Sequence, residues 1–371
     1  MSAMRTVVLG GYGNFGARIC RALSERGGVE VIAAGRDPEH GCSAAQFDAR
    51  IGHARIDLTA ANFASTLDAL APAIVVHCAG PFQGQGYHVA QAAIAAGAHY
   101  IDFADGRDFV ANFAERTHRA ARAAGVLAVS GASTLPALSS AVVDSLGRRL
   151  RQVDEIHIVI APPQRAPRGA ATIAGVFSYA GKSFKWLSGG EWRDAYGWQE
   201  LRRVRIAGLS PRWAAACDVP DLALFPARYP GVDTVEFRAA LELCIQHVGL
   251  WLAAWLRRAG VALPLERWVQ TFSQIPAGLA QFGSERGGML VSLVGTREDG
   301  SRARVEWHLT AEANHGPEIP CMAAILLVEK LVRGEIATRG AFPCMGFLAL
   351  TEFESEFRRW QITTLVRDGA A

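Results

Sequence analysis

The sequence contains little lysine, and this scarcity limits the chemistry open to it. Of its 38 lysines and arginines, only Lys182, Lys185 and Lys330 are lysines. None of the six tyrosines is followed by a lysine four residues later. This excludes the Tyr–Lys pair with which one large class of dehydrogenases lowers the pKa of a catalytic tyrosine. Any mechanism that needs a lysine has three candidates.

Cysteine pairs are also missing. The seven cysteines include no CxxC pair and no short disulfide-like spacing. We therefore expect reduced thiols in a cytoplasmic protein that has no metal site. The first residues, MSAMRTVVLGG, lead directly into a strand-like segment and leave no room for a signal peptide.

An excess of one charge and a long uninterrupted apolar run are absent as well. The 38 basic and 35 acidic residues give a net charge of +3, too small to predict a nucleic-acid partner. The most apolar stretch, Ala239–Leu256, is interrupted by Glu242, Gln246 and His247. We expect it to be a helix buried in the protein or in a homodimer interface and not a membrane anchor. A helix lying on a membrane surface is the alternative.

The chain is long enough for two domains, since half of its 371 residues are hydrophobic. In the first third, short β-branched runs alternate with alanine-rich helical stretches, which predicts an α/β fold with a doubly wound parallel sheet, the Rossmann architecture. The predicted strands are Thr6–Gly10, Val29–Ala34, Ala54–Asp57, Ile74–Cys78, Tyr100–Asp102 and Leu127–Ser130. The predicted helices are Asn14–Arg26, Thr59–Leu70 with Thr59 as its N-cap, Tyr87–Ala96 and Asp108–Ala124.

The pattern changes after Ser130 and indicates a second, α+β domain with its own sheet. The predicted helices there are Ala137–Leu150, Val235–Ala259 and Pro320–Arg333. The predicted strands are Asp154–Ala161, Arg359–Leu365 and a hairpin of Gly288–Gly295 with Arg302–Thr310.

The strongest motif is a GxGxxG sequence, Gly11-Tyr12-Gly13-Asn14-Phe15-Gly16, between the first strand and the first helix. In this context Gly11 allows a tight turn, Gly13 lets the backbone approach a pyrophosphate, and Gly16 lets the helix pack closely on the strand. The helix N-terminus then offers N–H groups and a partial positive charge to the phosphates. The motif predicts a dinucleotide site that includes Tyr12, Asn14 and Phe15.

The end of the second strand bears on the choice between NADP and NAD. The strand is followed by Gly35-Arg36-Asp37, so the first side chain offered is a guanidinium, which pairs well with a 2′-phosphate. Asp37 leaves NAD open, because a carboxylate there would accept bonds from the ribose hydroxyls. It is equally suited to cap the next helix, with Pro38 at the first helical position. We expect NADP.

Two further strand ends are expected to line the cofactor. Asp57 ends the third predicted strand, where it would accept a hydrogen bond from the adenine amino group. The fourth strand ends in His77-Cys78-Ala79-Gly80-Pro81-Phe82, and the turn Cys78–Phe82 would flank the ribose and nicotinamide. His77 itself is expected to be a strand residue satisfied by the backbone.

Four segments together resemble the saccharopine dehydrogenase-like family, in particular its NADP-binding domain. They are GGYGNFG (10–16), HCAGPF (77–82), GQGYHVAQAAIAAGAHYIDFAD (84–105) and SGASTLP (130–136). NHGPEIPCMA (314–323) is similar to bacterial members of that family. The resemblance implies a Rossmann domain, an α+β domain that carries the substrate, a return of the chain to the first domain near its end, and nicotinamide chemistry at a carbon–nitrogen bond.

We accordingly expect a Rossmann domain at residues 1–135 and a substrate and dimerisation domain at residues 136–345. A C-terminal segment, residues 346–371, would return to the first domain.

Hydride transfer needs a proton donor and usually a cation for a substrate carboxylate. Asp102 and Asp105 are candidate proton donors at the end of the fifth strand, although both also suit structural turns. His315 lies in a loop of the second domain and is another candidate. Arg168 and Lys182 are candidate anion-binding groups, with ordinary surface charge as the alternative.

Taken together, these features predict an NADP(H)-dependent oxidoreductase that acts on a small organic substrate. Two alternatives stay open: a non-catalytic NADP-binding sensor or scaffold, and a carbonyl or enoyl reductase.

Overall fold

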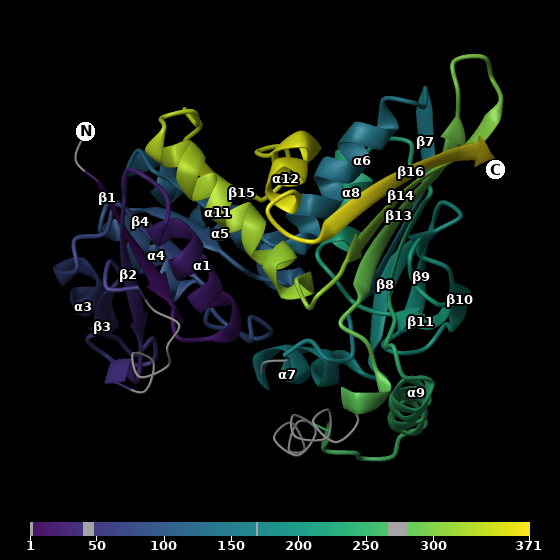
Figure 1. Ribbon diagram of the computed structural model, residues 1–371, viewed down its shortest axis with the longest axis horizontal. Helices are drawn as coiled ribbons and strands as arrows, with labels where there is room; N and C mark the ends of the chain where they lie inside the picture. Colours follow the sequence, from purple (N-terminus) through teal and green to yellow (C-terminus); the bar gives the residue numbers. More distant parts are fainter. Residues whose placement is uncertain (1–2, 40–47, 168–169, 266–279) are drawn as a thin grey trace. The chain divides into compact units, whose positions relative to one another are not determined.

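The computed structural model describes residues 3–39, 48–167, 170–265 and 280–371. The chain forms two compact units (Figure 1). The first unit contains residues 1–137 and 320–348, and the second contains residues 138–319 and 349–371. Each unit has its own sheet.

The first unit is built on a seven-stranded sheet in the order β15-β6-β5-β4-β1-β2-β3, and every strand pair in it is parallel. Its strands are β1 (Met4–Leu9), β2 (Val29–Gly35), β3 (Gly52–Arg55), β4 (Ile74–His77), β5 (His99–Asp102), β6 (Leu127–Ser130) and β15 (Gly340–Pro343). Its helices are α1 (Asn14–Ser24), α3 (Phe63–Ala69), α4 (His88–Ala95), α5 (Arg107–Ala123) and α11 (Ile319–Val332). The predicted Rossmann architecture is confirmed. The chain reverses its direction of winding between β1 and β4, so the loops that follow these two strands meet at one edge.

The helix predicted to begin at Thr59 begins at Phe63 instead. Thr59 donates both its backbone N–H and its hydroxyl to Asp57 Oδ1, at 2.9 and 2.8 Å. The side chain is therefore used in a local turn and does not cap the helix.

The chain returns to the first unit earlier than expected. Residues 320–348 supply α11 and the edge strand β15, while 349–371 belong to the second unit. Arg26 at the end of α1 pairs with Glu329 of α11, and β15 pairs with β6. The expected return at residues 346–371 is thus corrected, because the last residues form a strand of the other sheet.

The second unit contains a mixed nine-stranded sheet, which confirms the α+β prediction. Its main order is β10-β11-β12-β7-β13-β14-β16, with β8 paired to β12 and to β9. The strands are β7 (Gln152–Ala161), β8 (Ser183–Ser188), β9 (Glu191–Tyr196), β10 (Arg202–Val204), β11 (Arg212–Ala216), β12 (Thr234–Ala239), β13 (Gly287–Thr296), β14 (Arg302–Ala311) and β16 (Ile362–Ala370). The helices are α6 (Ser139–Gly147), α7 (Ala170–Tyr179), α8 (Asp221–Arg228), α9 (Cys244–Arg258) and α12 (Leu350–Phe357). The predicted hairpin is β13 with β14.

The helix predicted over Val235–Ala259 is wrong in its first part. Residues Thr234–Ala239 form β12, which pairs in parallel with β7, and α9 begins only at Cys244. Val235 and Phe237 are buried in the core, while Glu236 and Arg238 alternate with them on the other face. This period of two favours a strand, but it is too short to stand out beside the long apolar helix that follows.

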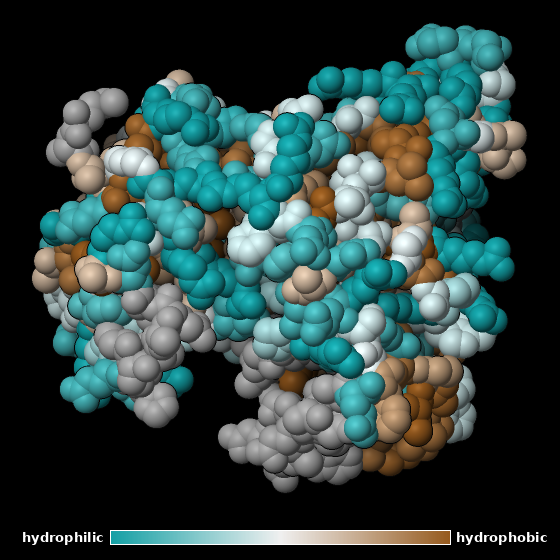
Figure 2. All heavy atoms as spheres, viewed as in Figure 1, coloured by the Kyte–Doolittle hydropathy of each residue, from teal (hydrophilic) through white to brown (hydrophobic). Residues whose placement is uncertain are grey.

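Helix α9 presents an apolar stripe to solvent. Ile245, Val248, Leu252 and Trp255 are all exposed, and Figure 2 shows the brown patch that they contribute to. Their spacing of three and four residues places them on one face of the helix. No helix in the described ranges is long and apolar enough to cross a membrane.

Candidate functional site

The glycine loop connects β1 to α1 in the first unit. The residue in the left-handed conformation is Gly10, with φ of 77°, one position before the predicted Gly11. Gly13 is the N-cap of α1 in extended conformation, and no side chain caps the helix. A Cβ at Gly16 would lie 2.2 Å from the carbonyl oxygen of Gly10. The loop therefore folds tightly around an uncapped helix N-terminus, which is an anion-binding arrangement.

The remaining side chains of the motif hold this loop in place. The Tyr12 hydroxyl donates to the carbonyl oxygen of Ala33 on β2, at 2.9 Å. Asn14 Oδ1 accepts a hydrogen bond from Arg18 at 2.6 Å. The Phe15 ring packs against that of Phe103, with centroids 5.0 Å apart. The three side chains thus support the loop that would carry a pyrophosphate.

Polar groups expected at the adenosine end lie where β2 and β3 finish. Arg36 directly follows β2 and is exposed. The prediction that Asp57 ends the third strand is wrong, because Asp57 lies two residues beyond the end of β3. Hydrogen bonds from the backbone and hydroxyl of Thr59, and then the charge of Arg36, hold the pKa of Asp57 below its usual range. An ionised acceptor and a guanidinium thus lie near each other at this edge.

The turn Cys78–Phe82 follows β4. Gln85 Nε2 donates to the carbonyl oxygens of Ala79 and Pro81, at 2.9 and 2.6 Å, and fixes the turn. The peptide bond between Gly80 and Pro81 is cis. Burial raises the pKa of the Cys78 thiol well above its usual value, so the group is a neutral thiol at physiological pH.

His77 is completely buried at the end of β4. Its Nδ1 lies 2.9 Å from the hydroxyl of Tyr100 on β5, and a hydrogen bond with the backbone of Ala79 also acts on the ring. Burial lowers the pKa of His77 to about 3, and the ring is neutral at physiological pH. Its edge contacts the ring of Phe82 at a centroid distance of 5.0 Å. His77 therefore supports the turn that follows it.

Asp102 is buried, and its side chain links the end of β5 to the end of β6. Its Oδ1 accepts hydrogen bonds from the backbone of Ala104 at 3.0 Å and Gly131 at 2.8 Å, and from the Ser130 hydroxyl at 3.0 Å. Burial raises its pKa to about 7, against these hydrogen bonds, which lower it. A carboxyl with no exposed surface that fixes two loops is suited to hold the sheet edge in shape. This favours the structural alternative for Asp102.

Asp105 differs from Asp102 because the residue has exposed surface, although burial by the surrounding protein still raises the pKa of its carboxyl above the usual value. Gln83 Nε2, in the loop that follows β4, donates to its Oδ1 at 3.2 Å. The structure therefore joins the turn after β4 to the turn after β5 and leaves the Asp105 carboxyl at the surface of the first unit.

The candidates in the second unit lie in separate places. His315 precedes a single 3-10 turn, accepts a hydrogen bond from the backbone of Gln361 at 3.2 Å and packs on Trp360. Lys182 is exposed in the turn before β8. Among the described residues no contact joins Lys182 to His315. Arg168 lies outside the described residues.

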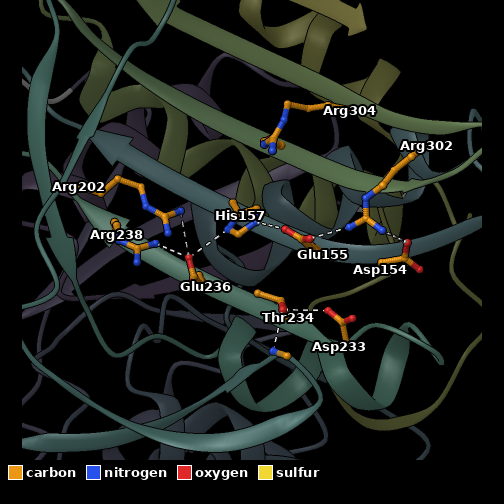
Figure 3. Close-up of polar contacts among 12 residues, drawn as sticks. Asp154, Glu155, His157, Arg202, Asp233, Thr234, Glu236, Arg238, Arg302 and Arg304 are labelled. Atoms are coloured by element: carbon orange, nitrogen blue, oxygen red, sulfur yellow. Dashed lines mark hydrogen bonds and ion pairs between the residues drawn. The ribbon is translucent and has the colours of Figure 1, made fainter. Parts of the chain in front are cut away.

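A charged network crosses one face of the second sheet (Figure 3). On β12 the buried Glu236 accepts a hydrogen bond from Arg238 and lies 3.1 Å from Nδ1 of His157 on β7. Glu155 lies 2.9 Å from the other ring nitrogen and pairs with Arg302. Burial raises the pKa of Glu236, but the hydrogen bonds from His157 and Arg238 outweigh it and bring the pKa to about 2. The charges neutralise one another and stabilise this face of the sheet.

The second unit also contains a pocket of about 380 Å³. The guanidinium of Arg212 in its wall is buried, donates to two carbonyl oxygens at the end of β7, and pairs with Glu242 at 3.5 Å. Arg286 pairs with Glu312 at 3.1 Å. These charged groups of the lining are therefore engaged with protein, and the pocket lacks the unpaired charge that marks a site for an ionic ligand.

Sequence reasoning missed Gln85, Tyr100, His53 and Arg55. The first two lie in the segment 84–105 that resembles the family, but they act only through contacts with the turn after β4 and with His77, which the sequence does not show. His53 and Arg55 lie on β3, in register with Ala33 and Gly35 of β2. The expected strand order could have drawn attention to them, because it places the third strand beside the second.

Comparison with known proteins agrees with this geometry. Residues 6–129 match the family model described as the saccharopine dehydrogenase NADP binding domain. The fold is similar to apo histidine-tagged saccharopine dehydrogenase (L-Glu forming) from Saccharomyces cerevisiae, with 12% identity, a TM-score of 0.66, and 99% of this chain and 100% of that chain covered. It is also similar to the homospermidine synthase hss from Legionella pneumophila in complex with NAD, with 10% identity, a TM-score of 0.62, and coverage of 99% and 92%. At these identities the likeness establishes the fold alone. No curated protein matches the sequence significantly.

Proposed function

We propose that this chain, which belongs to the saccharopine dehydrogenase-like family through residues 6–129, is an NADP(H)-dependent oxidoreductase. It would transfer a hydride to or from a small organic substrate, at a carbon–nitrogen bond. The family match confirms the resemblance seen in the sequence, and the fold is shared with a saccharopine dehydrogenase.

The observation that carries the proposal is the uncapped N-terminus of α1, which directly follows the glycine turn. It lies at the edge where the loops after β1 and β4 meet, the position at which doubly wound sheets bind ligands. The helix N-terminus binds the pyrophosphate, and Arg36 binds the 2′-phosphate. Asp57 accepts a hydrogen bond from the adenine, and the turn Cys78–Phe82 lies beside the ribose. When bound, the nicotinamide supplies the hydride chemistry.

Asp105 is the group best suited to hold or release a proton, because it lies between two loops at this edge and burial raises the pKa of its carboxyl above the usual value. Lys182 is the candidate cation for a substrate carboxylate, since it is exposed and carries no ion pair among the described residues. The carbon–nitrogen bond rests on the family and on the fold shared with a saccharopine dehydrogenase and a homospermidine synthase.

A non-catalytic NADP-binding sensor is the second candidate function. Two of the four catalytic candidates, Asp102 and His315, accept hydrogen bonds from backbone N–H groups and thereby stabilise the fold. Because these two side chains have structural roles, fewer groups are left for catalysis, which favours a sensor.

A turnover screen separates these two functions. NADPH oxidation is followed with keto acids plus amines, with preformed imines, and with ketones and enones. We expect turnover with imines and its loss in Asp105→Asn, with NADPH affinity retained. Tight NADPH binding without turnover of any of these substrates would favour the sensor, and turnover of ketones or enones alone would favour a carbonyl or enoyl reductase.

We also propose that the chain is a cytoplasmic homodimer in which the apolar stripe of α9 is buried. A single charged substitution on that stripe, Leu252→Glu, tests the dimer. Analytical ultracentrifugation should show a dimer for the unmodified protein and a monomer for the variant. A monomeric unmodified protein would contradict the proposal.

A further inference from the structure

The end of β3 contributes to the same surface as the end of β2. The two strands pair in parallel, and their register aligns Ala33 with His53 and Gly35 with Arg55. Paired residues of adjacent strands point to the same face of a sheet, because the pleats are aligned. His53 and Arg55 therefore lie on the face toward which a side chain at Gly35 would point.

Tyr12 covers that face. A Cβ at Gly35 would lie 2.7 Å from Tyr12 Cδ2. The Tyr12 ring stacks on His53 with centroids 5.9 Å apart and an angle of 13° between the planes, and its hydroxyl lies 3.4 Å from His53 Nδ1. Dinucleotide sites that prefer NAD place a carboxylate at the end of this strand to bind the ribose hydroxyls. Here that position is a glycine covered by an aromatic ring.

Two arginines lie at the ends of the same two strands. Arg36 follows β2 directly, and Arg55 is the last residue of β3; both are exposed. Within the described part of the chain, neither guanidinium makes an ion pair or a hydrogen bond. This sets them apart from Arg5 and Arg50 of the same unit, which pair with Glu30 and Asp48.

Asp57, the acidic residue near these arginines, does not pair with both of them. The charge of Arg36 lowers the pKa of Asp57, but Asp57 accepts its hydrogen bonds from Thr59. Two guanidinium groups at adjacent strand ends, with no carboxylate bonded to either, suit a phosphate dianion, which each can bind through a pair of N–H groups.

We propose that Arg55 is a second phosphate-binding residue, which acts with Arg36 on the 2′-phosphate of an adenosine nucleotide above the Tyr12–His53 ring pair. The inference rests on the proposed function and deepens it, because it assigns the preference for NADP(H) over NAD(H) to β3 as well as to β2. Tyr12 and Gly35 contribute because the last position of β2, where a carboxylate would repel the phosphate, is a glycine covered by the tyrosine ring.

Calorimetric titration of the full chain with four probes tests this assignment: NADPH, NADH, 2′,5′-ADP and 5′-AMP. Arg55→Ala should weaken NADPH and 2′,5′-ADP by about tenfold, the usual effect of losing one charge-assisted hydrogen-bonding partner. It should leave NADH and 5′-AMP within about twofold. Arg55→Glu should weaken the two phosphorylated probes further. Arg122→Ala is the control, because it removes an equal charge from an exposed position on α5.

The possible outcomes separate this inference from the proposed function. If the unmodified chain prefers NADPH and Arg36→Ala weakens it while Arg55→Ala does not, the assignment of Arg55 is wrong and the proposed function stands. Equal loss of NADPH and NADH in Arg55→Ala also overturns the assignment, because the residue would then act on the fold or the common part of the nucleotide. If the unmodified chain binds neither dinucleotide, both proposals fall.

Discussion

The polar groups at the edge of the first sheet and those on the face of the second sheet are arranged in opposite ways. At the edge of the first sheet, α1 begins without a side-chain cap. The exposed Arg36 and Arg55 make no direct ion pair or hydrogen bond among the described residues, although the charge of Arg36 acts on Asp57. On the second sheet Glu236 and Glu155 each contact His157 and an arginine. Groups that bind each other stabilise a fold, whereas groups left to solvent at the end of parallel strands are suited to bind a ligand. The contrast supports the proposal of a cofactor site in the first unit.

The largest expected effect is at the glycine loop. Gly16→Ala would place a Cβ 2.2 Å from the carbonyl oxygen of Gly10, so the turn must shift away from the helix N-terminus. We expect NADPH affinity to fall by about 100-fold, because the loss of two charge-assisted hydrogen bonds to the pyrophosphate, at about 1.5 kcal/mol each, amounts to about 3 kcal/mol. Calorimetric titration measures this loss. Gly27→Ala, at the other end of the same helix, is the matched control, because a Cβ there meets nothing within 4 Å. An affinity unchanged in Gly16→Ala would contradict the role of the loop.

The next effect concerns two buried carboxyls, one in each unit. Asp102 bonds two backbone N–H groups as well as Ser130, whereas Asp221 accepts a hydrogen bond from the hydroxyl of Ser139. Asp102→Ala leaves the backbone donors of Ala104 and Gly131 unpaired and should cost about 3 kcal/mol of unfolding free energy. Asp221→Ala should cost less, because a hydroxyl can rotate to another acceptor. Urea denaturation of both variants compares them. A larger loss of unfolding free energy in Asp221→Ala than in Asp102→Ala would contradict this prediction.

The same two carboxyls predict a pH dependence. Burial raises both pKa values from 3.8 to about 7 in the folded protein, so the folded state holds protons that the unfolded state has released. Their stabilisation is fully present below about pH 4 and is lost as the pH rises through 7. Asp102→Asn and Asp221→Asn, which cannot ionise, should flatten the stability profile between pH 4 and 7. Melting temperatures across that range give the measurement, and an unchanged slope in both variants would contradict the assignment.

The smallest effects are expected for the surface candidates of the second unit. Lys182→Met removes an exposed side chain and should leave the melting temperature within about 2 °C, since exposed charges contribute little to stability. If Lys182 binds a substrate carboxylate, KM should rise while NADPH affinity is unchanged. Arg193→Met, on the neighbouring strand β9 and exposed, is the control. A KM equal in both variants would remove Lys182 from the site.

Most of the first unit could be predicted from the sequence because its signals are local. The GxGxxG turn and the apolar strands each lie within a few residues of the structure they specify. The order of β1 to β6 then follows from the rules of βαβ connection. β15 could not be predicted this way, because Gly340–Pro343 joins β6 across more than half the chain.

The candidate site was predictable only where a motif marks it. The glycine loop and Arg36 follow from spacing along the sequence. The structural role of Asp102 depends on donors from Ser130 and Gly131. The phosphate-binding role proposed for Arg55 depends on its pairing with Gly35. Such contacts arise from the register of strands far apart in the sequence, and no local pattern encodes them. In the second unit, a local pattern does mark β12, but its period of two is too short to stand out beside the apolar helix α9 that follows it.

The most direct test of the central claim is the affinity of the full chain for NADPH and NADH, before and after Arg36→Ala. We expect one NADPH to bind per chain more tightly than NADH. Arg36→Ala should weaken NADPH by about 10-fold to 100-fold, because it removes a charge-assisted phosphate contact, and should leave NADH unchanged. Tighter binding of NADH, with neither affinity altered by Arg36→Ala, would contradict the account.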